Sequence, residues 1–163
     1  MEDFELTSLV QNGYFYAFKY DAVNKDAVFD AVPFILCLVP SEKHPNVFAG
    51  LNLHKLPLSD RIQFLVKLDK EFSMKEGDNR IEEFMLRDLL KTSMPVLKNA
   101  IRWYNRMNMA DIYRVKSGSV GKYIDYDGYV KNGSPSDVMN KYWLNYYKTE
   151  TAEAQEKDPF KQD

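Results

Sequence analysis

The first half of the chain arranges apolar and polar positions in short runs that are typical of β-strands. Residues 14–20 ("YFYAFKY") place successive side chains on opposite sides of a strand. Residues 34–39 ("FILCLV") are continuously apolar between two prolines, which indicates a strand covered on both faces. Residues 47–54 ("VFAGLNLH") give another strand, interrupted by a glycine. Because the connections are short, residues 13–55 predict a small antiparallel or mixed sheet.

The middle of the chain changes to apolar spacings of three and four, which predict helices. A first helix follows Pro57, with Ser59 as its expected N-cap. A second is predicted over residues 81–90 and a third over residues 95–104. The fold class is therefore predicted as α+β, a sheet packed by three helices.

The end of the chain has a different character from residue 116 onward. A glycine-rich stretch leads to a predicted amphipathic helix over residues 135–148. We expect three segments: an amino-terminal segment (1–12), a compact module (13–115) and an extended arm (116–163). The arm's aromatic face docks either on the module or on a neighbouring subunit, and its candidate docking residues are Met139, Tyr142, Trp143 and Tyr146.

The stretch "VFAGLNLHKLP" (residues 47–57) is the most distinctive motif of the chain. Gly50 permits a close backbone approach, and Asn52 and His54 lie on one side of the strand. Both polar groups can satisfy main-chain groups where the strand ends, and Pro57 precedes a helix. We interpret Gly50, Asn52, His54 and Pro57 as a structural corner. A small-molecule pocket lined by Asn52 and His54, and hence a small enzyme, is the alternative.

Composition gives little support to nucleic-acid binding. The chain has 22 basic and 24 acidic residues and a net charge of −2, whereas proteins that bind phosphate backbones usually carry a basic surplus or patch. One candidate patch consists of Lys98, Arg102 and Arg106, which would share a face of the third helix at spacings of four. We favour a solvated helix face over a nucleic-acid contact for these three residues.

Several chemistries lack the residues that they need. Cys37 is the only cysteine and lies in an apolar run, so a disulfide and a multi-cysteine metal site are excluded and an inert thiol is expected. The sequence contains no zinc-ligand motif and no phosphate-binding glycine loop. We expect no catalytic residues, no metal, no cofactor, no secretion signal and no membrane span, and a soluble protein of a reducing compartment.

Four stretches together resemble a family of small proteins of tailed, T4-like bacteriophages, some of which are DNA-end protectors. They are "YFYAFKYD" (14–21), "VPFILCLVP" (32–40), "VFAGLNLHKLP" (47–57) and "RIQFLVKLDK" (61–70). The resemblance covers residues 13–72 and extends loosely to about residue 106. Only the corner is specific, and a basic amino-terminal arm typical of the family is missing here.

The resemblance implies a non-enzymatic component of a phage particle, made in the host cytoplasm and located in the virion. Our main prediction is a structural or assembly protein of the neck, baseplate or tail that contacts other virion proteins in a large symmetric assembly. The alternative that the resemblance implies is a DNA-end-binding protector of the packaged genome, which the near-neutral charge does not favour.

Overall fold

A computed structural model of the chain describes residues 4–21, 28–40, 42–72, 78–124 and 129–131. Its centre is a six-stranded antiparallel sheet with the strand order β1-β7-β2-β4-β5-β6. The strands are β1 (Phe4–Leu6), β2 (Phe15–Tyr20), β4 (Phe34–Pro40), β5 (Val47–Asn52), β6 (Ile101–Asn105) and β7 (Met109–Val115). A separate antiparallel pair joins β3 (Val28–Asp30) to β8 (Tyr129–Lys131).

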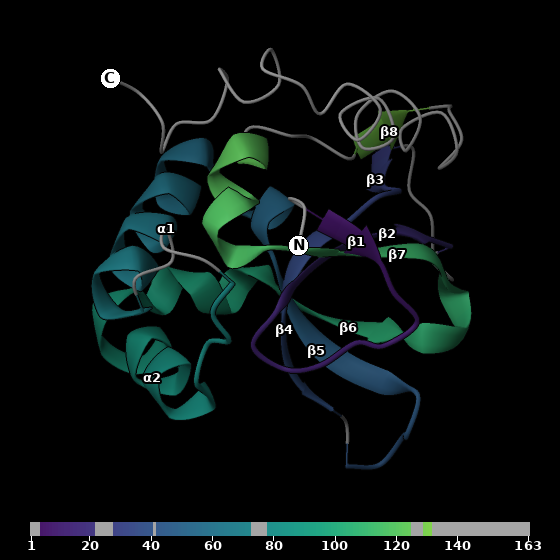
Figure 1. Ribbon diagram of the computed structural model, residues 1–163, viewed down its shortest axis with the longest axis horizontal. Coiled ribbons are helices and arrows are strands. Elements are labelled where there is room, and N and C mark those ends of the chain that lie inside the picture. Colours follow the sequence, from purple (N-terminus) through teal and green to yellow (C-terminus); the bar gives the residue numbers. More distant parts are fainter. Residues whose placement is uncertain (1–3, 22–27, 41, 73–77, 125–128, 132–163) are drawn as a thin grey trace.

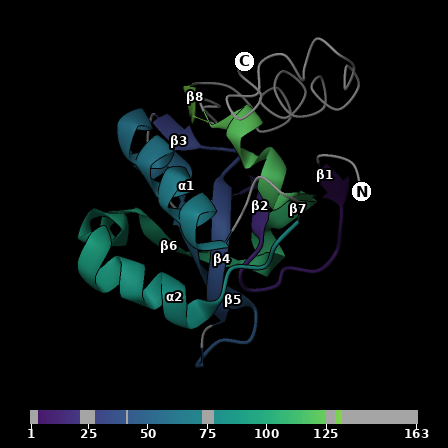
Figure 2. The ribbon, with the colours of Figure 1, turned by 60° about the vertical axis from the view of Figure 1, so that its left-hand side comes forward.

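The two α-helices lie on one side of this sheet, as Figures 1 and 2 show. The α-helices are α1 (Leu58–Phe72) and α2 (Glu83–Asp88), and α2 continues into a π-helical turn, η3 (Leu89–Ser93). Short 3-10 segments are η1 (Leu53–Lys55), η4 (Pro95–Ala100), η5 (Arg106–Asn108) and η6 (Ser117–Tyr123). The predicted α+β class is therefore confirmed.

Strand alternation divides the interior into two apolar clusters. On the helix side, Phe15 and Leu36 of the sheet pack with Phe64 and Leu68 of α1. On the opposite side, aromatic rings dominate, including Tyr16, Phe18, Phe48 and Tyr104. Because side chains of a strand point alternately to its two faces, both clusters draw on the same strands.

The segment between β1 and β2 covers the aromatic side of the sheet (Figure 1). Val10 is buried in the aromatic cluster. The backbone N–H of Gln11 donates to the Tyr16 hydroxyl at 2.8 Å, and that of Thr7 donates to the Ile112 carbonyl at 2.9 Å. Part of the predicted amino-terminal segment thus contributes to the core, while the three-part division of the chain stays a prediction.

Two details of the helix prediction are wrong. Helix α1 begins at Leu58, so Ser59 lies within its first turn and is not its N-cap. The Pro57 carbonyl accepts the first helical hydrogen bonds, from the N–H groups of Asp60 and Arg61 at 3.0 Å each. The third helix ends at Ala100 as a 3-10 segment, and the chain then extends as β6.

Pairing with β5 explains this second difference. Strand β6 aligns along β5 from Leu51↔Ile101 to Val47↔Asn105, so a ladder of backbone hydrogen bonds replaces the helical ones. After η5, the chain returns as strand β7, which pairs with β2. The predicted helix over residues 135–148, with Met139, Tyr142, Trp143 and Tyr146, lies outside the described residues.

Candidate nucleic-acid interface

Strand β6 and the segments that flank it form a stretch with positive charge and no acidic residue. Residues 89–110 contain Lys91, Lys98, Arg102 and Arg106 but no Asp or Glu. Within the described part of the chain, β6 is an edge strand that pairs with β5 alone. We name residues 89–110 the cationic edge.

The start of β6 holds a cation in a fixed position. The Arg102 guanidinium donates from Nη1 to the carbonyl oxygens of Asn99 and Ile101, at 2.7 and 2.9 Å. These contacts keep the group where η4 meets β6 without neutralising it, because carbonyls carry no net charge. Lys98 is also exposed, and the N–H of Ile101 donates to its carbonyl at this junction.

Arg106 has a different role from its two predicted companions. Its Nη2 donates to the Val10 carbonyl at 3.1 Å, and its guanidinium lies 5.7 Å from the centre of the Phe48 ring. It therefore attaches the β1–β2 segment to the aromatic side of the sheet. The predicted alignment of Lys98, Arg102 and Arg106 on one helix face is wrong, because the three residues belong to η4, β6 and η5.

Some cations in other parts of the fold are paired with carboxylates, although Arg80 donates instead to the Asn12 carbonyl at 2.9 Å. Lys19 lies 2.8 Å from Asp111, and Arg87 lies 2.7 Å from Glu83. Among the described residues, none of the four cations of the cationic edge forms such a pair. No carboxylate of the described residues therefore neutralises the charge of the cationic edge.

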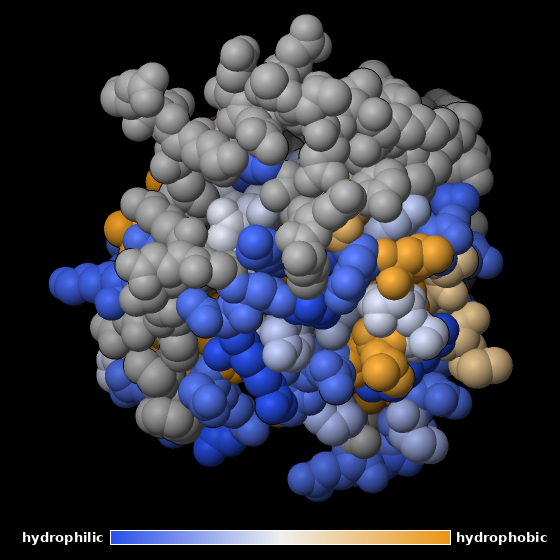
Figure 3. All heavy atoms as spheres, viewed as in Figure 1, coloured by the Kyte–Doolittle hydropathy of each residue, from blue (hydrophilic) through white to orange (hydrophobic). Residues whose placement is uncertain are grey.

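The cationic edge also exposes apolar side chains. On the face that Figure 3 shows, polar side chains cover most of the described surface, and apolar groups form small separate patches. Trp103 is 60% exposed, Met107 75% and Val96 40%. The strand alternation "IRWYN" could have indicated the exposure of Trp103, because Tyr104 packs in the aromatic cluster and Trp103 leaves the opposite face of β6.

The Asn52 side chain of the "GLNLH" corner is engaged within the fold. The Asn52 side chain accepts a hydrogen bond from the His54 N–H at 2.9 Å and donates one to the Tyr104 hydroxyl at 3.0 Å. His54 is 5% exposed, and its ring lies 6.5 Å from that of Phe34. A Cβ at Gly50 would lie 2.8 Å from Ile35 Cδ1. This geometry supports the proposed structural corner of Gly50, Asn52, His54 and Pro57.

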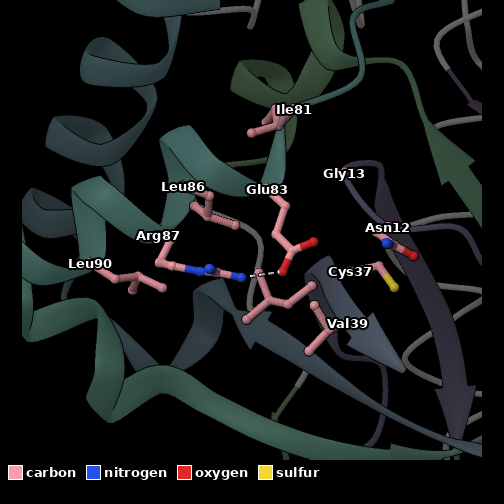
Figure 4. A pocket seen from close by; sticks show the side chains of 10 residues that line it. Asn12, Gly13, Cys37, Val39, Ile81, Glu83, Leu86, Arg87 and Leu90 are labelled. Atoms are coloured by element: carbon pink, nitrogen blue, oxygen red, sulfur yellow. Dashed lines mark hydrogen bonds and ion pairs between the residues drawn. The ribbon is translucent and has the colours of Figure 1, made fainter. Parts of the chain in front are cut away.

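A cavity of about 200 Å³ lies between α2 and the second half of β4. Its lining is mainly apolar, and the Glu83–Arg87 ion pair crosses its side (Figure 4). Cys37 also lines it, and burial raises the pKa of that thiol to about 12. Neither Asn52 nor His54 contributes to this cavity, and a thiol with that pKa is a poor nucleophile at neutral pH.

Two further features bear on the class of protein. None of the described helices is long and apolar enough to cross a membrane. In the same part of the chain, no three His, Cys, Asp or Glu side chains gather as a metal site would require.

The structure defines a small α+β protein with an exposed, positively charged sheet edge. Comparison with family models gives a match over residues 5–86 to the family described as "Phage T4 terminal DNA protecting protein". The match covers half of the chain, and the chain belongs to this family. The resemblance predicted from residues 13–72 is thereby confirmed.

No match was found among curated proteins or among solved structures. The family is described by protection of DNA and not by an enzymatic activity. The matched range extends from β1 into α2, so most of the residues of the sheet lie within it and the cationic edge lies beyond its end.

Proposed function

We propose that this protein binds the ends of linear phage DNA and protects them, as the description of its family indicates. The family match is the observation that carries the proposal. It favours the DNA-end protector over the structural or assembly role that was our main prediction from sequence.

The cationic edge supplies the binding surface in this proposal. Lys98 and Arg102 are exposed and face no described carboxylate partner. Binding to a phosphate backbone depends on such local charge, because each neutralised phosphate releases condensed counterions. The net charge of −2 averages over the whole chain and does not describe this surface.

An exonuclease challenge tests the proposal. Linear duplex DNA is mixed with the protein and then exposed to a processive exonuclease, and the surviving full-length DNA is measured over time. We expect the wild type to protect the DNA and Lys98→Glu/Arg102→Glu to protect it at least tenfold less well. The control is Lys67→Glu/Lys70→Glu on α1, which changes the net charge equally and should protect like the wild type. Absence of protection by the wild type would refute the proposal.

A second candidate function is docking onto other virion proteins. Helix α1 exposes an apolar stripe at spacings of four, with Leu58 46%, Ile62 47% and Val66 58% exposed. Apolar helix stripes of this kind favour contact with another protein surface. This proposal includes a location in the virion and docking through the candidate residues Met139, Tyr142, Trp143 and Tyr146.

A truncation after Lys131 tests the docking role. The cut leaves η6 in place, because Val120 and Tyr123 are part of the helix-side core. If the truncated protein and an Ile62→Glu variant both enter particles as the wild type does, the docking role is excluded.

A further inference from the structure

The ring of Trp103 is the most exposed aromatic group of the cationic edge, and its backbone is held firmly. Trp103 pairs with Ala49 in the β5–β6 ladder, and its side chain is 60% exposed. A large flat apolar ring therefore stands in solvent on a strand whose position the sheet fixes. Such a ring offers stacking area with little entropy to lose on binding, since its side chain has only two rotatable bonds.

One cation near this ring is also fixed in place, on the other face of the strand, because adjacent side chains of a strand point to opposite faces. Arg102 precedes Trp103 directly, and its guanidinium is held at the carbonyls of Asn99 and Ile101. Lys98 lies in η4, which leads into the strand. A cation and a stacking surface thus lie on the two faces of the same short piece of the sheet edge.

The chemistry of a DNA terminus matches this combination. The interior of a duplex exposes phosphates and groove edges, whereas its base-pair faces are stacked on one another. Only the last base pair presents an open aromatic face. A flat ring with phosphate-binding cations beside it therefore distinguishes an end from the interior, and it does so for any sequence because every base has a π-face.

We propose that Trp103 stacks on the terminal base pair of duplex DNA while Arg102 and Lys98 hold the adjoining phosphates. This inference rests on the proposed DNA-end function and specifies how the end is recognised. Trp103 provides the preference for ends, and the two cations provide the general affinity for DNA. The same site binds blunt ends of unrelated sequence with similar affinity.

The test compares two DNA molecules of identical internal sequence, an open blunt duplex and the same duplex closed by a hairpin loop at each end. Dissociation constants are measured by fluorescence anisotropy at one salt concentration, and their ratio gives the preference for ends. Stacking is worth about 1–3 kcal/mol per base, so Trp103→Ala should reduce that preference by about 5- to 150-fold. Affinity for the closed duplex should not change.

Three further variants separate stacking from other effects. Trp103→Leu keeps an apolar side chain without a flat ring and should behave like Trp103→Ala, whereas Trp103→Phe should retain part of the preference. Met107→Ala removes another exposed side chain, 75% exposed, from the same stretch and should behave like the wild type. Circular dichroism and urea unfolding confirm that each variant is folded.

The outcomes distinguish the inference from the proposed function. If the wild type prefers open ends and Trp103→Ala and Trp103→Leu keep that preference, stacking by Trp103 is overturned and the proposed function stands. If the wild type binds both DNA molecules equally or not at all, the proposed function itself falls. If Trp103→Ala changes the oligomeric state in sedimentation and leaves DNA binding intact, the exposed edge is a protein contact and the inference is overturned.

Discussion

The two edges of the central sheet use arginine in opposite ways. At the β1 edge, the Arg114 guanidinium contacts Asp78 at 2.7 Å and Glu5 at 3.3 Å, and its side chain is 17% exposed. It also lies 4.7 Å from the centre of the Tyr14 ring. At the β6 edge, the Arg102 guanidinium contacts only carbonyl oxygens among the described residues.

Arg114 is paired with carboxylates of the fold, whereas Arg102 is not paired with any carboxylate of the described residues. Burial alone would lower the pKa of Arg114, but the hydrogen bonds and charges of Asp78 and Glu5 outweigh it and raise that pKa. The Asp78 carboxylate also accepts from the Ser117 N–H at 3.5 Å. The charges of the β1 edge thus hold β1, β7 and η6 together, while Arg102 at the β6 edge has no carboxylate partner among the described residues.

Substitution of Arg114 by Met should give the largest loss of stability. The change leaves Asp78, which is 23% exposed, without its cation and removes charged hydrogen bonds. We expect the free energy of unfolding to fall by about 2–3 kcal/mol, measured by urea denaturation. The matched variant Arg102→Met should change it by no more than about 0.5 kcal/mol. Similar losses at both positions would remove the distinction between the edges.

The attachment of β6 to the rest of the sheet depends on Asn52. Its side chain is 1% exposed and binds both the His54 N–H and the Tyr104 hydroxyl. Asn52→Ala should therefore cost about 2 kcal/mol. Tyr104→Phe removes the hydroxyl alone and should cost about 1 kcal/mol. Additive losses in the double variant would show that the two groups are not coupled.

Cys37 lies on β4, in the middle of the sheet, and its thiol should make the stability of the fold depend on pH. Burial raises the pKa of its thiol from 9.0 to about 12, so folding favours the protonated form. The contribution of this pKa shift to the free energy of unfolding is fully present below pH 9 and is lost as the pH rises toward 12. Relative to Cys37→Ala, the wild type should lose about 1.4 kcal/mol between pH 7 and pH 10. Parallel stability curves for the two proteins would contradict the buried thiol.

Neutralising the β6 edge should have the smallest effect on stability and a clear effect on DNA binding. Lys98→Gln/Arg102→Gln should leave the urea midpoint unchanged. The slope of log affinity against log salt should become shallower by about 0.9 for each phosphate that the variant no longer neutralises. Lys67→Gln/Lys70→Gln on α1 serves as the control and should keep the wild-type slope. An unchanged slope in the β6 variant would place the phosphate-binding groups elsewhere.

The spacing of apolar residues along the chain predicts the central strands and α1 well, but it predicts the two edges of the sheet poorly. The runs that become β2, β4 and β5 are bounded by turn or proline signals, and α1 has a regular apolar stripe. Each of these elements could be identified from residues close in sequence. The structural corner could likewise be singled out, because a glycine and two polar groups interrupt an apolar run.

The β6 edge could not be assigned in this way. Val96, Leu97, Ile101 and Tyr104 have helical spacing, and the partner that makes β6 a strand begins at Val47, far away in sequence. Strand β1 is only three residues long, and its partner Val115 is even farther from Phe4 in the sequence. Non-local pairing therefore determined both edges, and with them the positions of the candidate DNA-binding residues.

Hydrogen exchange of the protein with and without a short blunt DNA duplex tests the central claim most directly, because it maps where the DNA lies. We predict slower exchange of the amides of residues 95–108, which include β6, and unchanged exchange in β1 and β7. Slower exchange at β1 and β7 with no change at β6, or no change anywhere under conditions in which DNA is bound, would contradict the assignment of the β6 edge as the DNA-binding surface.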